Sequence, residues 1–527
     1  MANRSEFKQM RSLMIEKKIP FYVYKSVNTG ITICFAETKG PYVSGYFNIN
    51  HANEMFSDRL PRVLEHLIFT GSEKYPYYGT LDKWRERCRA TFSSESSHYY
   101  TYYQVTTPTT EEFLYLLPVY LDHIFYPTLT KSAFLTEIHH INGKGEDAGK
   151  FYCKQKSVDP TLEFIVMRDT VRAIFKNNDC HLFEMLNDDD MRYFRDYDDK
   201  TMKWYHKKFF TPNNLTIFIA GQVKHDTIFK ALMPLVQKLI SQEPYYGEYD
   251  QTPYTLTFLK RINTQIYVIY PCTSTNIVMS FIWQEPSLVN EIYKKLGCYI
   301  LWSYIVRNGS IQNIFNESRV IENAKVCLCA DFHTSVFNLQ FIGNEGDMLK
   351  RHFSSRILDQ LKMTMKWSLL KVLSKFHENG VNMETIRIEI DNINNNVLSS
   401  LKNEDSQYLA NIVFNYIRFG EDTNALDEMC NILHNLKKLK VEPQSFWINL
   451  FEKYFVNQPM ITFVKSLEEK EMEKYIQRDE ERIKEQIEEL GPDGLKQKEM
   501  ELQEAIREIE KPIPEEVLAN MPIPRTF

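Results

Sequence analysis

Short apolar segments with a two-residue period alternate with longer segments of helical period through the first 250 residues. Residues 21–37 predict two strands joined at Asn28-Thr29-Gly30, because apolar side chains recur at every second position. The same criteria predict further strands at 42–50 and 98–107, helices at 61–69, 81–92, 111–125 and 161–175, and a helix, turn, apolar strand and helix across 198–240. Strands mixed with helices in this order are typical of an α+β fold.

The pattern begins again after residue 250 and follows a similar order. It predicts strands at 256–262, 265–271 and 277–283, a helix at 287–306, a hairpin at 322–333 and 336–343, helices at 352–376 and 383–404, and a last strand from 461. The repetition predicts a duplicated α+β unit, with domains at 1–250 and 251–466.

Residues 467–527 differ from the rest because most of their positions up to 511 are charged or polar. They predict a charged helical hairpin, interrupted at Gly491-Pro492-Asp493-Gly494, and an extended proline-rich tail. Such a segment is either a solvated arm or an element that docks on or links other parts of the protein.

Composition excludes some classes of protein. The chain has 527 residues, 43% of them hydrophobic and 25% charged, as in soluble globular proteins of several domains. A net charge of −6 gives no reason to expect nucleic-acid binding. Nine scattered cysteines without a C-x-x-C pair indicate buried thiols in a reducing compartment. The charged start has no apolar signal-peptide core and no run is long enough to span a membrane, so we expect a cytoplasmic protein.

Chemistry enters at the segment PRVLEHLIFTGS, residues 61–72. On a helix, Arg62, Glu65 and His66 share one face. In H-x-x-E-H helices, two histidines hold zinc and the glutamate between them activates a water molecule. Here arginine stands at the first histidine position, and taken alone Glu65-His66 is an ordinary solvated pair.

The surrounding sequence closely resembles the insulinase/pitrilysin-type metallopeptidases, whose helix reads H-x-x-E-H-L-x-F-x-G-S-x-x-Y-P. Further segments of the chain resemble this family in order: LLPVYLDHIFYPTLT, TEIHHINGKGEDAGKFYCKQK, KKFFTPNNLTIFIAGQV and LGPDGLKQKEMELQEAI. The resemblance covers essentially the whole chain and points to the large branch of the family. It implies two homologous α+β domains, each with a mixed, mainly antiparallel sheet packed with helices, followed by a charged helical arm at 467–527.

The resemblance assigns His66 to the second histidine ligand and Glu65 to the general base. Arg62 stands at the first histidine ligand, and Lys154 stands at the third ligand, which is acidic in the family. Ser93 falls where the family has an asparagine that holds substrate backbone. Ser93 and Ser94 are therefore the candidates for contacting an extended peptide, and strand addition near 99–106 is the expected mode.

Two cations at ligand positions argue against a metal. Neither side chain has a lone pair to donate when charged, and a unit charge about 4 Å from Zn²⁺ costs about 8 kcal/mol at an effective dielectric constant of 20. We therefore expect no cofactor, with Glu65 paired to Arg62, Lys154 or both. The local residues that offer other ligands for a rebuilt site are His98, His123, His139, His140, Glu146 and Asp147.

Three interpretations of the chain remain open at this point. The chain is a catalytically inactive homologue that serves as a peptide- or protein-binding or partner subunit, an active zinc metalloendopeptidase with a non-standard site, or a remnant without function. In the resembled branch a second half follows the linker at which this sequence ends. The chain is thus expected to be a half-length protein, a fragment, or one that pairs with another half-molecule or with itself.

Overall fold

The computed structural model describes the chain in segments. They are residues 6–50, 60–96, 100–158, 194–195, 197–241, 276–284, 286, 291–307, 321–331, 336–345, 355–403, 406–419, 423–458, 460–466, 469–519 and 521. The helix predicted at 161–175 and the strands predicted at 256–262 and 265–271 lie outside these segments.

A seven-stranded sheet forms the centre of the first half, in the order β1-β2-β3-β9-β4-β6-β5. Its strands are β1 (Phe7–Ile15), β2 (Ile19–Ser26), β3 (Thr32–Ala36), β4 (Val43–Asn50), β5 (Thr91–Ser96), β6 (Tyr100–Thr107) and β9 (Leu215–Ala220). Only β3 and β9 run parallel, so the sheet is mixed and mainly antiparallel as expected. All six residues of β9 are buried, which explains their uninterrupted apolar sequence.

Helices cover one face of this sheet, and their apolar stripes build its core. They are α2 (Leu60–Leu67), α3 (Thr80–Arg87), α4 (Thr110–Phe125), α9 (Asp199–Phe209) and α10 (His225–Ser241). Between α4 and α9 lie the short α5 (Lys131–Ala133), the π-helical turn η1 (Phe134–Ile138), the hairpin β7 (His140–Ile141) and β8 (Asp147–Ala148), and α6 (Lys150–Val158). The short helix η3 (Pro212–Asn214) leads into β9.

The second half contains a smaller antiparallel sheet in the order β11-β12-β10-β13. Its strands are β10 (Asn276–Gln284), β11 (Ile321–Asp331), β12 (Val336–Glu345) and β13 (Ile461–Ser466). The helices are α11 (Ile292–Arg307), α14 (Ser355–Asn379), α15 (Met383–Lys402), α16 (Ser406–Phe419), α17 (Thr423–Met429), α18 (Ile432–Leu439) and α19 (Gln444–Phe451), followed by η4 (Glu452–Val456). The two α+β units confirm the fold class, while the domain boundaries at 250 and 466 stay predictions.

The two units share a hydrophobic interface on the face of the first sheet that α2 and α4 leave open. Helix α16 packs there, and the ring of Phe414 stacks on Tyr102 with centroids 4.9 Å apart. Tyr46 Oη lies 3.0 Å from Ser406 Oγ. At the tip of the β1–β2 hairpin, both carboxylate oxygens of Glu16 accept from the backbone N–H of Leu433, at 3.1 Å each. The sheet and the second unit therefore form one packed interface.

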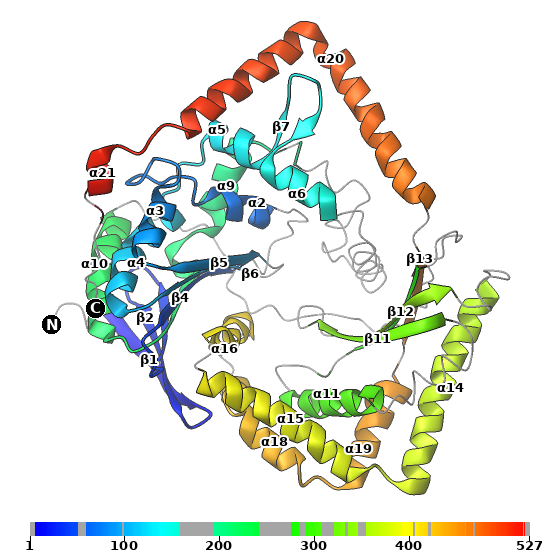
Figure 1. The fold of residues 1–527 in the computed structure, drawn as a ribbon. Helices are drawn as coiled ribbons and strands as arrows, with labels where there is room; N and C mark the ends of the chain where they lie inside the picture. Colours follow the sequence, from blue (N-terminus) through cyan, green and yellow to red (C-terminus); the bar gives the residue numbers. More distant parts are fainter. Residues whose placement is uncertain are drawn as a thin grey trace.

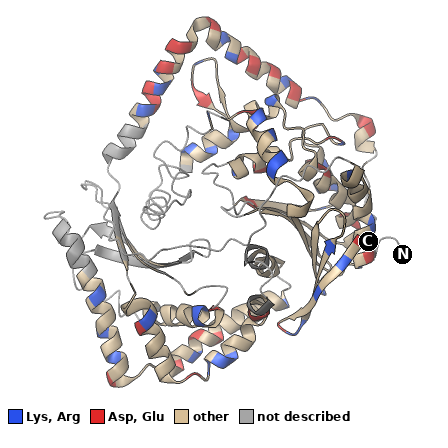
Figure 2. Ribbon diagram, turned by 180° about the vertical axis from the view of Figure 1, so that it is seen from behind, with Lys and Arg blue, Asp and Glu red and all other residues tan. Residues whose placement is uncertain are grey.

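Helix α20 (Glu469–Ile509) leads away from β13 and arches back to the first unit (Figure 1), where α21 (Glu515–Ala519) ends the described helices. Gly491 has φ +60° and breaks the helix into two legs. The legs diverge instead of packing side by side, so the predicted helical hairpin is wrong. Figure 2 shows acidic and basic residues interspersed along the described parts of both legs, which leaves little apolar surface for one leg to bury against the other.

The arm docks on the first unit, in agreement with the docking alternative. Arg482 Nε lies 2.7 Å from Asp147 Oδ2, and the backbone N–H of Gly143 donates to Glu499 Oε2 at 3.1 Å. Asp147 is 1% exposed. Although burial acts to raise it, the hydrogen bond from His139 and the charge of Arg482 hold the pKa of Asp147 well below its usual range.

The strands predicted at 21–37 and 42–50 are confirmed, and that predicted at 98–107 is confirmed over its described residues 100–107, but two edge strands were missed. Strand β1 was read as a charged start. The helix predicted at 81–92 ends at Arg87 and had included the first two residues of β5, while the rest of β5 had no assignment. Both strands lie at the edges of the sheet, where pairing on one side is enough to hold polar sequences in an extended conformation.

Candidate site at helix α2

Helix α2 positions the residues singled out from the sequence. Its apolar residues Leu60, Val63, Leu64 and Leu67 are buried in the core of the first unit. The opposite face carries Arg62, Glu65 and His66, of which Arg62 and His66 are exposed and Glu65 is half-buried. The strong amphipathic pattern of the helix therefore turns the whole motif away from the core.

Strand β5 supplies the partners of Glu65. Ser94 Oγ donates to Glu65 Oε1 and Ser96 Oγ donates to Glu65 Oε2, both at 2.6 Å. Ser94 and Ser96 lie two residues apart on β5, so their side chains point to the same face. Both carboxylate oxygens are thus engaged by neutral donors. The expected pairing of Glu65 with Arg62 or Lys154 is wrong, since within the described segments neither cation forms an ion pair with it.

Helix α6 brings Lys154 to the same place. The ring of Phe151 lies 4.4 Å from the ring of His66, centroid to centroid. Lys154 follows Phe151 by three residues and therefore lies on the same side of α6, where its side chain is exposed. The structure thus brings together the two segments whose residues Arg62 and Lys154 the family resemblance aligns with metal ligands.

The pKa of His66 reflects the proximity of these two segments. Burial by surrounding atoms lowers the pKa of His66, and the positive charges of Lys154 and Arg62 lower it further. The carboxylates of Glu65 and Glu137 act in the opposite direction without reversing the shift. His66 therefore lies within the electrostatic reach of both cations and of both carboxylates.

A close backbone approach fixes the start of α6. Gly149 has φ +126°, and a Cβ at this position would lie 2.2 Å from the carbonyl oxygen of Ile138. Only glycine fits both the conformation and the space. Tyr152, one turn into α6, is fully buried. The AG segment that marks the family resemblance thus anchors the helix that carries Lys154.

The sequence reasoning missed Glu137, which lies in η1 between the two helices. Lys150 Nζ lies 2.6 Å from Glu137 Oε1, and the hydroxyl of Tyr78 donates to the same oxygen at 3.0 Å. The segment TEIHHINGKGEDAGK contained Glu137 and Lys150, but nothing in their spacing indicated that they pair. Like Glu65, this carboxylate has partners other than Arg62 and Lys154.

The residues at this site do not fit a zinc ion. Arg62 and Lys154 present cationic groups, so among these four residues His66 and Glu65 offer at most two ligands, and Glu65 is already engaged by Ser94 and Ser96. A catalytic zinc needs three protein ligands with free lone pairs. Across the segments that the structure describes, no three His, Cys, Asp or Glu side chains converge in a way that could hold a metal ion.

The residues considered for a rebuilt site have structural partners instead. His123 bonds the carbonyl oxygen of Val119 at 2.8 Å inside the core, and His140 bonds that of Leu135 at 2.7 Å. Three more pairings complete the set: His139 with Asp147, Asp147 with Arg482, and Glu146 with Asn142. His98 lies outside the described residues.

Strand β5 ends the sheet and also carries the two serines expected to contact a peptide. Ser94 faces Glu65, while Ser93 Oγ donates to Gln104 Oε1 at 2.7 Å on the other face. Alternate residues of β5 are exposed. The strand pairs with β6 on one side, and an edge strand of this kind can accept an extended chain on the other.

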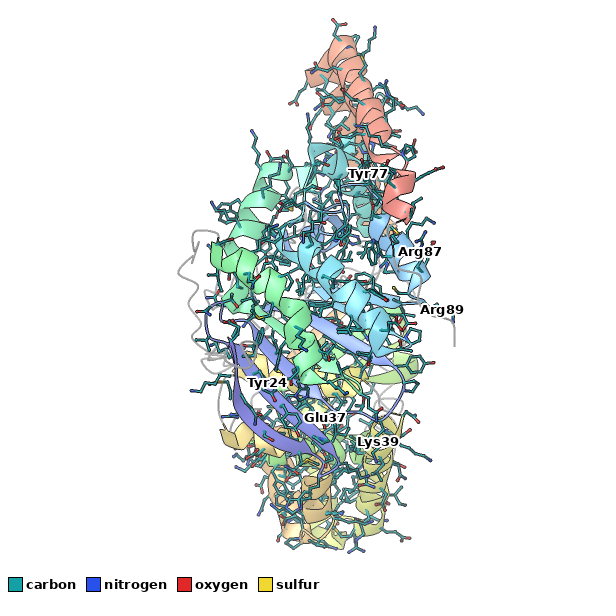
Figure 3. All side chains as sticks on the ribbon, turned by 90° about the vertical axis from the view of Figure 1, so that its left-hand side faces the viewer. Tyr24, Glu37, Lys39, Tyr77, Arg87 and Arg89 are labelled. Atoms are coloured by element: carbon teal, nitrogen blue, oxygen red, sulfur yellow. The ribbon has the colours of Figure 1, made fainter. Side chains whose placement is uncertain are left out.

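A second feature, which the sequence did not indicate, lies at the opposite edge of the sheet. A groove of about 1500 Å³ runs between the β1–β2 hairpin and the start of α10. Tyr24, Glu37 and Lys39 lie along it (Figure 3). His225 lines it as well and stacks on Phe35 with ring centroids 4.0 Å apart. Because β1 and β5 are the two edge strands, this groove is separate from the Glu65 site.

Comparison with known families identifies the protein class. The sequence profile described as insulinase (peptidase family M16) matches residues 61–172, and that of the peptidase M16 inactive domain matches residues 199–365. The chain belongs to the insulinase/pitrilysin-type peptidase family, M16. The resemblance of its motifs to this family is thereby confirmed.

Similar proteins span much of the chain. An uncharacterized protein of Caenorhabditis elegans, C05D11.1, is 28% identical over 509 residues, which are 93% of this chain and 48% of that protein. The mitochondrial presequence protease of Candida albicans is 25% identical over 203 residues, 36% of this chain and 18% of that protein. The chain spans about half the length, or less, of the curated relatives it matches.

Solved structures share the fold. An M16-like peptidase from Alicyclobacillus acidocaldarius superposes with a TM-score of 0.59 at 15% identity, over 86% of this chain and 99% of that one. The periplasmic protease PqqL of Escherichia coli superposes with a TM-score of 0.61 at 13% identity, over 88% of this chain and 47% of that one. In the part of the chain that the structure describes, no helix is both long enough and apolar enough to cross a membrane.

Proposed function

We propose that this chain is a catalytically inactive member of the family that binds peptides or proteins or serves as a partner subunit. One observation carries the proposal: the cations Arg62 and Lys154 act on His66, and the family resemblance assigns their two positions to metal ligands. Both Arg62 and Lys154 are exposed and lower the pKa of that imidazole. Arginine stays protonated at all physiological pH values, so Arg62 cannot become a metal ligand by titration.

The state of Glu65 supports the same conclusion. A general base has to be oriented toward the water that it deprotonates. Here each carboxylate oxygen already accepts a serine hydroxyl at 2.6 Å. The carboxylate therefore fastens α2 to β5, a structural role that preserves the fold of the vacated site.

Binding of an extended peptide along β5 is the proposed remaining activity. The strand ends the sheet beside α2, and its alternate side chains are exposed. One similar structure is that of the ferredoxin protease FusC in complex with Arabidopsis ferredoxin, with a TM-score of 0.53 at 10% identity over 97% of this chain and 51% of that one. A protein or peptide ligand is our proposal for this chain by analogy.

A partner unit is the second part of the proposal. The matched segment is about half of each long relative, so we propose that it works beside another insulinase-type unit or beside a second copy of itself. Light scattering of the purified chain distinguishes a self-associating protein from a monomer. We place the protein in a reducing compartment, the cytoplasm, because the described cysteines are free thiols. Cell fractionation tests this against a mitochondrial location.

Hydrolysis is the direct test of inactivity. The chain is incubated with a complex peptide mixture and added zinc, and the products are read by mass spectrometry. We expect neither the chain nor its Glu65→Gln variant to cleave the peptides, so the two samples should give the same mass spectra. Cleavage that disappears both in Glu65→Gln and with a chelator would show an active peptidase with a non-standard site and would overturn the proposal.

A further inference from the structure

Within the described segments, Arg62 and Lys154 are two positive charges for which no ion pair is found. Two carboxylates act electrostatically on His66, those of Glu65 and Glu137. Glu65 is held by Ser94 and Ser96, and Glu137 is held by Lys150 and Tyr78. Within the described segments, neither Arg62 nor Lys154 forms an ion pair with either of them.

The geometry brings each of these two charges close to His66. Arg62 lies one helical turn before His66 on α2, and Lys154 lies one turn after Phe151 on α6. The ring contact between His66 and Phe151, 4.4 Å between centroids, joins the two helices at this point. Both cationic side chains are exposed and therefore accessible to a ligand.

We propose that Arg62 and Lys154 form a carboxylate-binding site at the position where catalytic members of the family hold a metal ion. The guanidinium group can bind a carboxylate through two parallel N–H donors, and the ammonium group adds a third donor and a second charge. The site inverts the charge preference of its ancestor, from a cation to an oxyanion. It rests on the proposed function as a peptide-binding protein and gives that function an anchor.

Strand β5 supplies the reason for a peptide carboxylate as the ligand. Ser94 and Ser96 connect β5 directly to α2, so an extended chain paired with β5 runs beside the two cations. A carboxylate on such a chain, at its C-terminus or on an Asp or Glu side chain, reaches the site. Acidic extended peptides are therefore the preferred class of ligand.

Nuclear magnetic resonance of the full chain with labelled histidine tests the site. The probes are N-acetylglycine, with a terminal carboxylate, the α-amide of N-acetylaspartate, with a side-chain carboxylate, and the neutral N-acetylglycinamide, all at constant ionic strength and pH. We expect saturable shifts of the His66 signals with one or both acids and none with the amide. The acid that binds tighter identifies the source of the carboxylate.

Variants assign the binding to the two cations. Arg62→Gln and Lys154→Gln should each weaken binding about tenfold, and the double variant should abolish it. Lys83→Gln, on exposed α3, is the matched control and should bind as the unaltered chain does. Equal binding of acid and amide, or acid binding that survives the double substitution, would overturn the inference. Because both side chains are exposed, either single variant suffices if the other fails to fold.

The outcome is separable from that for the proposed function. A chain that cleaves no peptide and ignores both acids refutes the carboxylate site alone. A chain that hydrolyses peptides through Glu65 refutes the proposed function, whatever it does with the acids.

Discussion

The hydroxyl of Ser94 donates a hydrogen bond to Glu65 Oε1 at 2.6 Å and joins the edge strand β5 to helix α2. Ser96 donates to the second oxygen of the same carboxylate at the same distance. A residue that matches the family's general base is thus a tie between two elements of the fold.

Removing these donors should cost stability. Hydrogen bonds to charged groups contribute about 1.5–3 kcal/mol each, so Ser94→Ala and Ser96→Ala should each lower the free energy of unfolding by about 2 kcal/mol. Urea denaturation of the full chain measures the change. The control is Ser93→Ala, which removes a bond to the neutral Gln104 and should cost less than about 1 kcal/mol. Equal effects at positions 93 and 94 would refute the assigned role of Glu65.

The arm should stabilise the first unit through Arg482. Asp147 is 1% exposed, and substitution of its cationic partner leaves a buried carboxylate with a smaller set of donors. Arg482→Gln is therefore expected to destabilise the first unit by about 3 kcal/mol, and limited proteolysis should cut α20 sooner. Lys484→Gln changes an exposed cation on the same helix and should leave both measurements unchanged. An arm that remains protected in Arg482→Gln would show that this ion pair does not hold it.

Acid should weaken the fold through His206. Burial lowers the pKa of His206 to about 4, although its hydrogen bond with the carbonyl oxygen of Ile124 opposes the shift. The unfolded chain takes up this proton near pH 6.5 and the folded chain only near pH 4, so stability is lost as the pH falls between these values. The loss amounts to about 3 kcal/mol at full effect.

Comparing the chain with its His206→Gln variant isolates the contribution of His206 to the pH dependence of stability. Glutamine can still donate to the carbonyl oxygen of Ile124 but does not titrate, so the variant should lose less stability between pH 7 and pH 4. Urea denaturation at several pH values gives the slope. Identical pH profiles for the two proteins would contradict the buried neutral state of His206.

The central strands and the arm's helicity could be predicted from local pattern, but their partners could not. Strand β9 is apolar at nearly every position and was found easily. Strand β5 reads TFSSES and became recognisable only through its pairing with β6. The contact between Arg482 and Asp147 joins residues 335 positions apart, and no local signal marks a contact of that separation.

For the candidate site too, the residues could be predicted from the sequence but their contacts could not. Family resemblance pointed to Arg62, Glu65, His66 and Lys154, and the structure places the two helices that carry them in contact. The resemblance did not indicate that Ser96 donates a hydrogen bond to the second oxygen of Glu65. Coulombic reasoning favoured an ion pair for Glu65, whereas serine hydroxyls reach it from a strand that the sequence did not reveal.

Restoring the family's ligands should restore metal binding. Arg62→His with Lys154→Glu replaces both cations by groups with lone pairs, beside His66 on helices already in contact. We expect the double variant to bind one zinc by calorimetry and each single variant to bind none tightly. A double variant with no affinity for zinc would mean that the two helices are no longer spaced for a metal.

The zinc content of the unaltered chain tests the central claim most directly. The protein is saturated with zinc, dialysed and measured by elemental analysis, with His66→Ala and the double restoring variant alongside. The cations at Arg62 and Lys154 predict no stoichiometric zinc in the unaltered chain and about one per chain in the restored variant. One zinc per unaltered chain that is lost in His66→Ala would contradict the account.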